Sequence, residues 1–401
     1  MSTEKSLQSI DRVMEHTAGN LQNDIKFIEC ANGYYYVKGW ANVGVIITSE
    51  GVVVIDTAMS NKHAQNIYHA IRERTDLPIK YVIYTHGHLD HVNSTHVFKE
   101  EDTSVIAHEN VNERHFKYKL LEHHHHRINS TQFQNKLGSM RSYDVIPPDI
   151  TFNKDHKISL GGKNIHIVHG KGETDDHCFI HVPEDDVVYC GDFFVWSFPN
   201  IGNPLKVIRY EREWYETLEK IKRLEPEILI PGHGKMIKGK DQVKMALQDV
   251  IDTLRFVHNE VIEHINKGTQ LEDALELIQL PEHLENSPYV KQSYGCLEFA
   301  IRGIYRRYTG WFDGNPTHLS PCKQEDVAAE MYSLVQDSQV ILKKCRSLMD
   351  EGRYQMALHL VDILVLSQNH EEAKALKKEA SEKCAETNQN FIMRNIYKQF
   401  V

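Results

Sequence analysis

The stretch Thr85-His86-Gly87-His88-Leu89-Asp90-His91 follows directly on the apolar run 79–84. This run predicts a buried strand, and Gly87 allows the chain to turn tightly where the strand ends. Side chains at such a turn can converge on one point, and imidazole nitrogens and carboxylate oxygens are the ligands that zinc and similar divalent metals bind. The stretch therefore predicts a metal site built from its three histidines and its aspartate: His86, His88, His91 and Asp90.

A solvated turn rich in histidine is the alternative interpretation of this stretch. The chain has 25 histidines, and the run His123-His124-His125-His126 shows that they can cluster in a polar region. No strand is expected before that run, so we interpret it as part of an exposed helix or loop. The strand before Thr85 favours a metal site at 86–91. The run at 123–126 is predicted to lie on the surface.

A metal site needs more ligands than this stretch supplies, and three further apolar runs end in the same way. Each predicted strand is followed by a glycine and by a carboxylate or imidazole side chain. The runs are 165–169, 187–190 and 228–230, and the candidate ligands after or within them are Glu173 with His169 and His177, Asp192, and His233.

The pattern His-x-His-x-Asp-His at 86–91 resembles the signature of the metallo-β-lactamase superfamily. A predicted hairpin over 43–55, followed by Asp56, resembles the region before that signature. The resemblance implies an α/β fold, an αββα sandwich, and places Asp56 behind the ligands as a supporting residue. It assigns His86, His88 and Glu173 to a first metal, with His169 and His177 as alternatives to Glu173. It assigns Asp90, His91 and His233 to a second metal, with Asp192 between the two.

The C-terminal part reads as helical, with predicted helices over 249–266, 271–278, 326–349, 354–367 and 371–386. Between them, Gly310-Trp311-Phe312-Asp313-Gly314-Asn315-Pro316 resembles a stretch in the dimerisation domain of type III alkyl sulfatases. We therefore expect a catalytic domain over 1–247 and an all-α dimerisation domain over 248–401, without the lipid-carrier-like domain of those enzymes. Pairing of the helical domains predicts a homodimer.

The resemblance implies a metal-dependent hydrolase that cleaves alkyl sulfate esters through a hydroxide bridging two divalent metals, with Asp90 orienting the hydroxide. Zinc suits these ligands, and manganese or iron are alternatives. The chain departs from the sulfatases in having Asp192 at the bridging position, where they have Glu, and in lacking their motif over 193–203. Candidate substrate-binding residues follow that loop or lie within it: Lys206, Arg209, Arg212 and Trp196. Hydrolysis of a lactone, thioester or β-lactam, or a non-catalytic metal-binding dimer, are the alternatives.

The resemblance implies a small apolar ester as substrate and a second copy of the chain as partner, and bulk properties argue against two other kinds of partner. The net charge of −10 argues against a nucleic-acid partner, which would favour a basic face. No apolar run approaches the ~20 residues that cross a bilayer, so no membrane span is expected. The seven cysteines lack C-x-x-C spacing, and residues 1–20 lack the apolar centre of a signal peptide. Both features predict a cytoplasmic protein.

Overall fold

The computed structural model describes residues 26–134 and 145–400, and their packing separates them into two units. Among the described residues, the first unit contains 26–126 and 145–308, and the second contains 127–134 and 309–400. The helices between 240 and 308 therefore pack within the first unit, although they were expected in the dimerisation domain. The domain boundary predicted at residue 247 stays a prediction. The packing of the described residues separates the two units at residue 308 instead.

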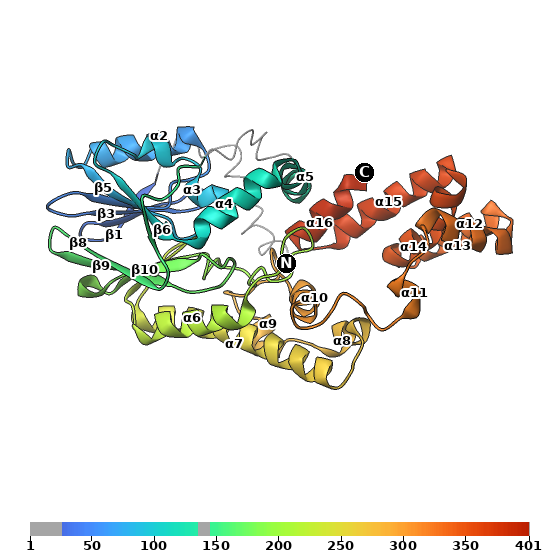
Figure 1. Cartoon of the computed structure of the whole chain (residues 1–401). Helices are drawn as coiled ribbons and strands as arrows, with labels where there is room; N and C mark the ends of the chain where they lie inside the picture. The colour runs from blue at the N-terminus through green and yellow to red at the C-terminus, as the bar shows by residue number, and fades with distance from the viewer. Residues whose placement is uncertain (1–25, 135–144, 401) are drawn as a thin grey trace. The chain divides into compact units, whose positions relative to one another are not determined.

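The first unit contains two mixed β-sheets (Figure 1). The first runs in the order β1 (Phe27–Ala31), β2 (Tyr34–Val37), β3 (Val43–Ile47), β4 (Val52–Ile55), β5 (Ile79–Ile83), β6 (Ser104–His108) and β7 (Ile150–Phe152). The second runs in the order β13 (Ile237–Lys238), β12 (Ile228–Pro231), β11 (Val187–Gly191), β10 (Cys178–Val182), β9 (Lys163–His169) and β8 (Asp155–Leu160). Neighbours from β4 to β7 are parallel, as are β11 and β12, and the other pairs are antiparallel.

Alternation along the central strands explains why the two sheets form a sandwich. In β4, Val53 and Ile55 face a core shared with the second sheet, whereas Val52 and Val54 face a different core on the outer side. Successive side chains of a strand point to opposite faces, so an uninterrupted apolar strand can be buried on both. Strand β11 divides in the same way, with Tyr189 in the shared core and Val188 in the outer one.

Helices cover both outer faces of the sandwich (Figure 1). Helix α2 (Asn61–Arg72) packs on the first sheet through Ala64, Ile67 and Ile71. Helices α6 (Glu211–Arg223) and α7 (Lys240–Asn266) pack on the second sheet, with the fully buried Trp214 in that core. The expected αββα sandwich is confirmed.

The remaining short elements of the first unit are mostly helical. They are α3 (Leu89–Val92), η1 (Thr95–Val97), α4 (Asn110–Leu120), η2 (Pro183–Asp185), α8 (Leu271–Leu277), α9 (Glu282–Glu285) and α10 (Leu297–Tyr308). Helix α5 (Glu122–Phe133) begins in the first unit and continues into the second, and it contains the histidine run at 123–126, of which only His125 is buried. Within the described ranges, no helix combines the length and apolarity needed to cross a bilayer.

The second unit is entirely helical in its described residues, as expected. It comprises α11 (Pro316–Leu319), α12 (Gln324–Val335), α13 (Ser338–Asp350), α14 (Tyr354–Gln368), α15 (Glu371–Thr387), α16 (Phe391–Tyr397), η3 (Lys398–Phe400) and the end of α5. The single helix predicted over 326–349 is wrong, because Gln336 adopts a left-handed conformation that ends α12 and Asp337 caps α13. Leu342, Val361 and Leu364 form the core of this unit.

Candidate metal centre

The predicted ligands lie at one edge of the sandwich. Strand β5 runs parallel to β4, and β12 runs parallel to β11, so the carboxyl ends of each pair meet at the same edge. The residues that follow these four ends, in loops and in the short helix α3, are Asp56, His86, His88, Asp90, His91, Asp192 and His233. Two groups of metal-ligating side chains form there, each with ligand atoms within 4.8 Å of one another.

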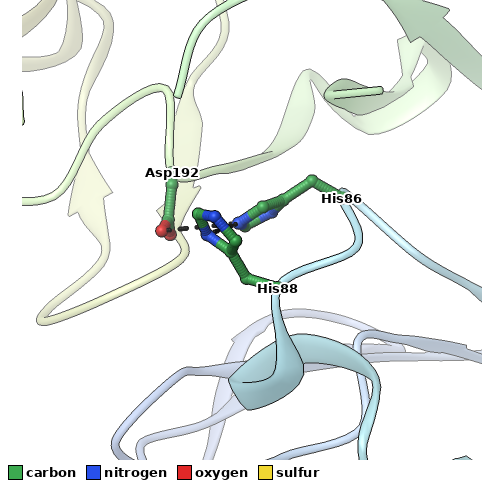
Figure 2. Close-up of side chains that lie close together, drawn as sticks. All are labelled: His86, His88 and Asp192. Carbon is green, nitrogen blue, oxygen red and sulfur yellow. Dashed lines mark hydrogen bonds and ion pairs between the residues drawn. The ribbon is translucent and has the colours of Figure 1, made fainter. Parts of the chain in front are cut away.

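The first group consists of His86, His88 and Asp192 (Figure 2). The Nε2 atom of His86 lies 2.9 Å from Nδ1 of His88 and 3.7 Å from Oδ2 of Asp192. Burial, reinforced by the neighbouring imidazoles, holds the pKa of His86 well below its usual value. A neutral imidazole is the form that coordinates a metal, so this cluster has the protonation state that a cation requires.

The second group consists of Asp90, His91 and His233. Asp90 Oδ2 lies 3.7 Å from His91 Nε2 and 3.5 Å from His233 Nε2. Each of these imidazoles has its other nitrogen engaged elsewhere: His91 Nδ1 lies 2.7 Å from Asp56, and His233 Nδ1 lies 2.5 Å from the carbonyl oxygen of Trp40. These contacts fix the rings so that both Nε2 atoms face the cluster, an orientation typical of metal-ligating histidines.

Asp192 connects the two groups. Its Oδ2 faces His86, whereas its Oδ1 lies 3.5 Å from His91 Nε2 and 3.4 Å from His233 Nε2. Burial opposes ionisation of this carboxyl, but the charges of His233 and His91 outweigh it and hold the pKa of Asp192 well below its usual value. The same carboxylate can therefore contact cations in both groups.

Unpaired buried atoms test whether the residues fit divalent cations. Within the described part of the chain, Asp192 Oδ1 and His91 Nε2 are buried and have no hydrogen-bond partner. A buried polar atom without a partner is costly, and a cation between these atoms would remove that cost. The donor set of imidazoles and carboxylates is also the one that zinc and related metals prefer. The residues fit.

Glycines allow the loops to approach this closely. A Cβ atom on Gly232 would lie 2.0 Å from Asp192 Oδ1, and one on Gly191 would lie 2.8 Å from His177 Nε2. Gly191 also has a φ of +51°, which favours glycine. The glycines before His233 and Asp192 are therefore needed for convergence of the loops, in addition to making the turn.

Glu173 lies beside the first group, in the loop between β9 and β10. Its Oε1 is 3.9 Å from His88 Nδ1 and forms an ion pair with Arg209. The two alternatives to Glu173 have other partners: His169 Nε2 lies 2.8 Å from the carbonyl oxygen of Asp175, and His177 Nε2 accepts a 3.1 Å hydrogen bond from the backbone N–H of Asp192. Of the three candidates, only Glu173 directs its side chain at His88.

The four candidate substrate-binding residues lie in different surroundings. Arg209 is buried beside Glu173, and burial lowers its pKa to about 10. Burial also lowers the pKa of Lys206 to about 8, against the opposing charge of Asp90. Trp196 is partly exposed and packs against Gly234, next to His233. Arg212 instead pairs with Glu216 on the exposed side of α6, so the structure does not bring it to the cluster.

Sequence reasoning missed a network that holds the turn between His86 and His88. Asp176 Oδ2 accepts a 2.6 Å hydrogen bond from the backbone N–H of Gly87, and its Oδ1 accepts one of 2.8 Å from Arg114. Arg114 also pairs with Asp175. The doublet Asp175-Asp176 before a buried strand was a visible signal, but Arg114 lies some sixty residues earlier on α4 and carries no local signal.

Comparison with known proteins places this architecture in a family. Residues 39–233 match the metallo-β-lactamase superfamily, and residues 270–400 match the alkyl sulfatase dimerisation domain. The hydroxyacylglutathione hydrolase GloC of Haemophilus influenzae is 30% identical over 169 residues, which are 40% of this chain and 72% of that protein. The chain belongs to the metallo-β-lactamase superfamily and combines its fold with an alkyl sulfatase dimerisation domain, which makes it a metal-dependent hydrolase by family.

Two similar proteins align with most of the chain. A linear primary-alkylsulfatase of Pseudomonas sp. is 23% identical over 383 residues, covering 88% of this chain and 72% of that protein. The solved structure of the stereoselective inverting sec-alkylsulfatase Pisa1 from Pseudomonas sp. superposes with a TM-score of 0.83 at 24% identity, covering 96% of this chain and 66% of that one. The chain spans 60% to 62% of the length of three further curated sulfatases. The structural likeness shows a shared fold.

Proposed function

We propose that this protein hydrolyses alkyl sulfate esters with two bound divalent cations, zinc being the metal that the ligands suit best. The observation that carries the proposal is the placement of Asp192 between two ligand groups, with the buried cation of Arg209 beside one of them. His86, His88, Glu173 and Asp192 would hold one metal, and Asp90, His91, His233 and Asp192 the other. Bound here, the metals would lower the pKa of a water and neutralise charge that develops on the ester.

The chain's own residues would bind and orient the ester. Arg209 is buried and charged, and its planar guanidinium can contact two oxygens of a sulfate group at once. Lys206 adds a second cation near Asp90. Trp196, which packs against Gly234 and lies at a tilted angle to Tyr289 with ring centroids 5.4 Å apart, offers an apolar wall for an alkyl chain. Asp56 keeps His91 in the orientation that a ligand needs.

The cations near the ligand groups favour a sulfate ester over other substrates of this fold. A lactone or thioester carries no charge on its reacting group and gains little from a buried guanidinium, whereas a sulfate ester keeps a full negative charge. The names of the curated alkyl sulfatases that align with most of the chain support the same choice.

Sulfate release from a medium-chain alkyl sulfate tests this proposal. Metal-loaded protein should release sulfate, whereas metal-stripped protein and His88→Ala should not, because His88 is one of the few ligands of the first group. Thioester and lactone substrates belong in the same assay. Turnover of those esters without turnover of sulfates would contradict the substrate assignment and leave the metal centre standing.

We also propose that the second unit pairs with its copy to form a homodimer. Three apolar side chains four and three residues apart lie exposed on one face of α12, with exposed fractions of 39% for Val327, 48% for Met331 and 86% for Leu334. Exposed apolar patches of this kind mark interaction surfaces. The match to the alkyl sulfatase dimerisation domain supports a second copy of the chain as the partner. Light scattering should give the mass of a dimer for the protein and that of a monomer for Met331→Glu with Leu334→Glu.

All seven cysteines are free thiols, and six of them are buried. Free thiols persist in reducing compartments. This supports the prediction of a cytoplasmic location, which fractionation of the native cells would test.

A further inference from the structure

Arg209 and His88 face the same oxygen atom of Glu173. Oε1 of that carboxylate lies 3.9 Å from His88 Nδ1 and forms the ion pair with Nη1 of Arg209. The ligand atoms that come together at the first group in the described residues are those of His86, His88 and Asp192, without Glu173. A metal at the first group and the guanidinium of Arg209 therefore compete for one oxygen.

Because Arg209 and Glu173 are both buried, separating their ion pair costs free energy. The Arg209 and Glu173 side chains are only 6% and 8% exposed. Removing one partner from a buried ion pair leaves an uncompensated charge, which destabilises a protein far more than the same loss at its surface. Glu173 can thus leave Arg209 readily only when another anion takes its place.

The charge of Arg209 also acts directly on the first group. Arg209 Nη1 pairs with the Glu173 oxygen that lies 3.9 Å from His88 Nδ1, so its positive charge lies beside the first group. A positive charge beside a group of ligands opposes a metal cation there by Coulomb repulsion. In the second group, His91 and His233 instead face the carboxylates of Asp90 and Asp192.

We propose that Arg209 makes metal binding at the first group dependent on the anionic substrate. Without substrate, Arg209 holds Glu173, and the first group binds a cation more weakly than the second. A sulfate group that binds Arg209 releases Glu173, which then contacts the first metal. This inference rests on the proposed function for its choice of anion. Coupling between two ligands is reciprocal, so the first metal strengthens sulfate binding by the same factor.

Zinc titration of the metal-stripped full-length protein, with a competing chelator and with or without inorganic sulfate, tests this proposal. We expect one tight and one weaker zinc, and sulfate should tighten the weaker one by about tenfold, within the usual range of such couplings. The tight zinc should not respond. Two zinc ions of equal affinity, or a weaker zinc that is indifferent to sulfate, would overturn the proposal. This arm uses the unaltered protein, so it needs no variant to fold.

Two variants sharpen the result. Arg209→Gln should tighten the weaker zinc by about tenfold and remove its response to sulfate, whereas Glu173→Gln should weaken that zinc when sulfate is present and leave the tight one unchanged. Arg223→Gln, an exposed arginine on α6 paired with Glu219, is the matched control and should behave like the unaltered protein. Circular dichroism checks that each variant folds. Weakening of the first zinc in folded Arg209→Gln would show that Arg209 only supports the loop.

The zinc titrations distinguish a failure of this inference from a failure of the proposed function. All measurements are of binding, with inorganic sulfate as the probe, so an enzyme that turned out to hydrolyse another anionic ester would still show the coupling. Conversely, alkyl sulfate turnover without coupling would keep the proposed function and reject only the role given to Arg209.

Discussion

The two ligand groups contain similar residues but differ in how their ligands are held. In the second group, His91 is fixed by Asp56 and His233 by the carbonyl oxygen of Trp40, so both rings present Nε2 to the cluster. In the first group, His86 Nδ1 lies 3.1 Å from the hydroxyl of Thr85, but His88 contacts His86 directly and Glu173 contacts Arg209. Ligands that are oriented by other buried groups are preorganised for a metal. The second group is therefore built before a metal binds, whereas the first group is built only in part.

Asp192→Ala is the change that should have the largest effect, because it removes a carboxylate whose two oxygens face the two groups. The loss also leaves His91 and His233 without the carboxylate that Asp192 places near their Nε2 atoms. We expect both zinc affinities to fall by at least about 100-fold and hydrolysis to be undetectable, as for the loss of a shared metal ligand. Inductively coupled plasma mass spectrometry after dialysis measures the retained metal.

Asp185→Ala, in the 3₁₀ helix η2 away from the ligand loops, is a control for the loss of a carboxylate, because this residue pairs with Lys163 and Tyr34 instead. Retention of one full zinc equivalent by Asp192→Ala would contradict the bridging position of this side chain.

Asp56→Asn should reduce the difference between the groups by loosening the second group, which we expect to bind the tighter zinc. Asp56 accepts hydrogen bonds from the backbone and hydroxyl of Thr85, and one of its oxygens contacts His91 Nδ1. An amide N–H₂ at that oxygen would face donors, so His91 would have to place its proton on Nε2, the atom that faces the metal. We expect the affinity of the tighter zinc to fall by about 10- to 100-fold.

The backbone itself should tolerate this substitution. Asp56 has a φ of 59°, and asparagine adopts that left-handed conformation at least as readily. Unchanged zinc affinity, with a melting temperature within a degree or so of the unaltered protein, would show that Asp56 does not orient His91.

The buried strands and the positions of the ligands at their ends could be predicted from the sequence because both depend on local patterns. Uninterrupted apolar runs such as 52–55 indicate strands buried on both faces, and a glycine before His233 or Asp192 marks where a strand ends. Parallel pairing then brings these ends together without further information. The break at Gln336 was not predictable in this way, because an apolar period continues across it and only its left-handed backbone interrupts the helix.

The contacts that distinguish the two groups depend on tertiary structure. The pair of Glu173 with Arg209 and the pair of Arg114 with Asp176 join residues from loops and helices far apart in the chain. Charged residues are common in surface positions, so nothing near Arg209 or Arg114 in the sequence distinguishes them from Arg212, which is exposed. Burial decides which charges act on the site, and burial is not a local property.

Asp176→Asn should produce the smallest effect and confine it to the first group. The carboxylate holds the N–H of Gly87, between His86 and His88, and its pKa is kept low by the charge of Arg114 against the effect of burial. An amide keeps one acceptor but loses the charge, which should cost about 1.5–3 kcal/mol of stability, as for hydrogen bonds to charged groups. We expect thermal melting to report this loss and the weaker zinc to loosen by a few-fold, because the turn between the two imidazoles is less firmly held.

Asp175→Asn is the matched control for that turn, since Asp175 pairs with the same Arg114 but the bond to Gly87 comes from Asp176. It should lower the melting temperature without changing either zinc affinity.

The low pKa of Asp176 also predicts the sign of the pH dependence. Its contribution to stability is present above the pKa of an unfolded aspartate and is lost as the pH falls through the lower value of the folded state. The difference in melting temperature between Asp176→Asn and the unaltered protein should therefore shrink in acid, and a difference that grew in acid would mean that the carboxyl is protonated in the folded protein.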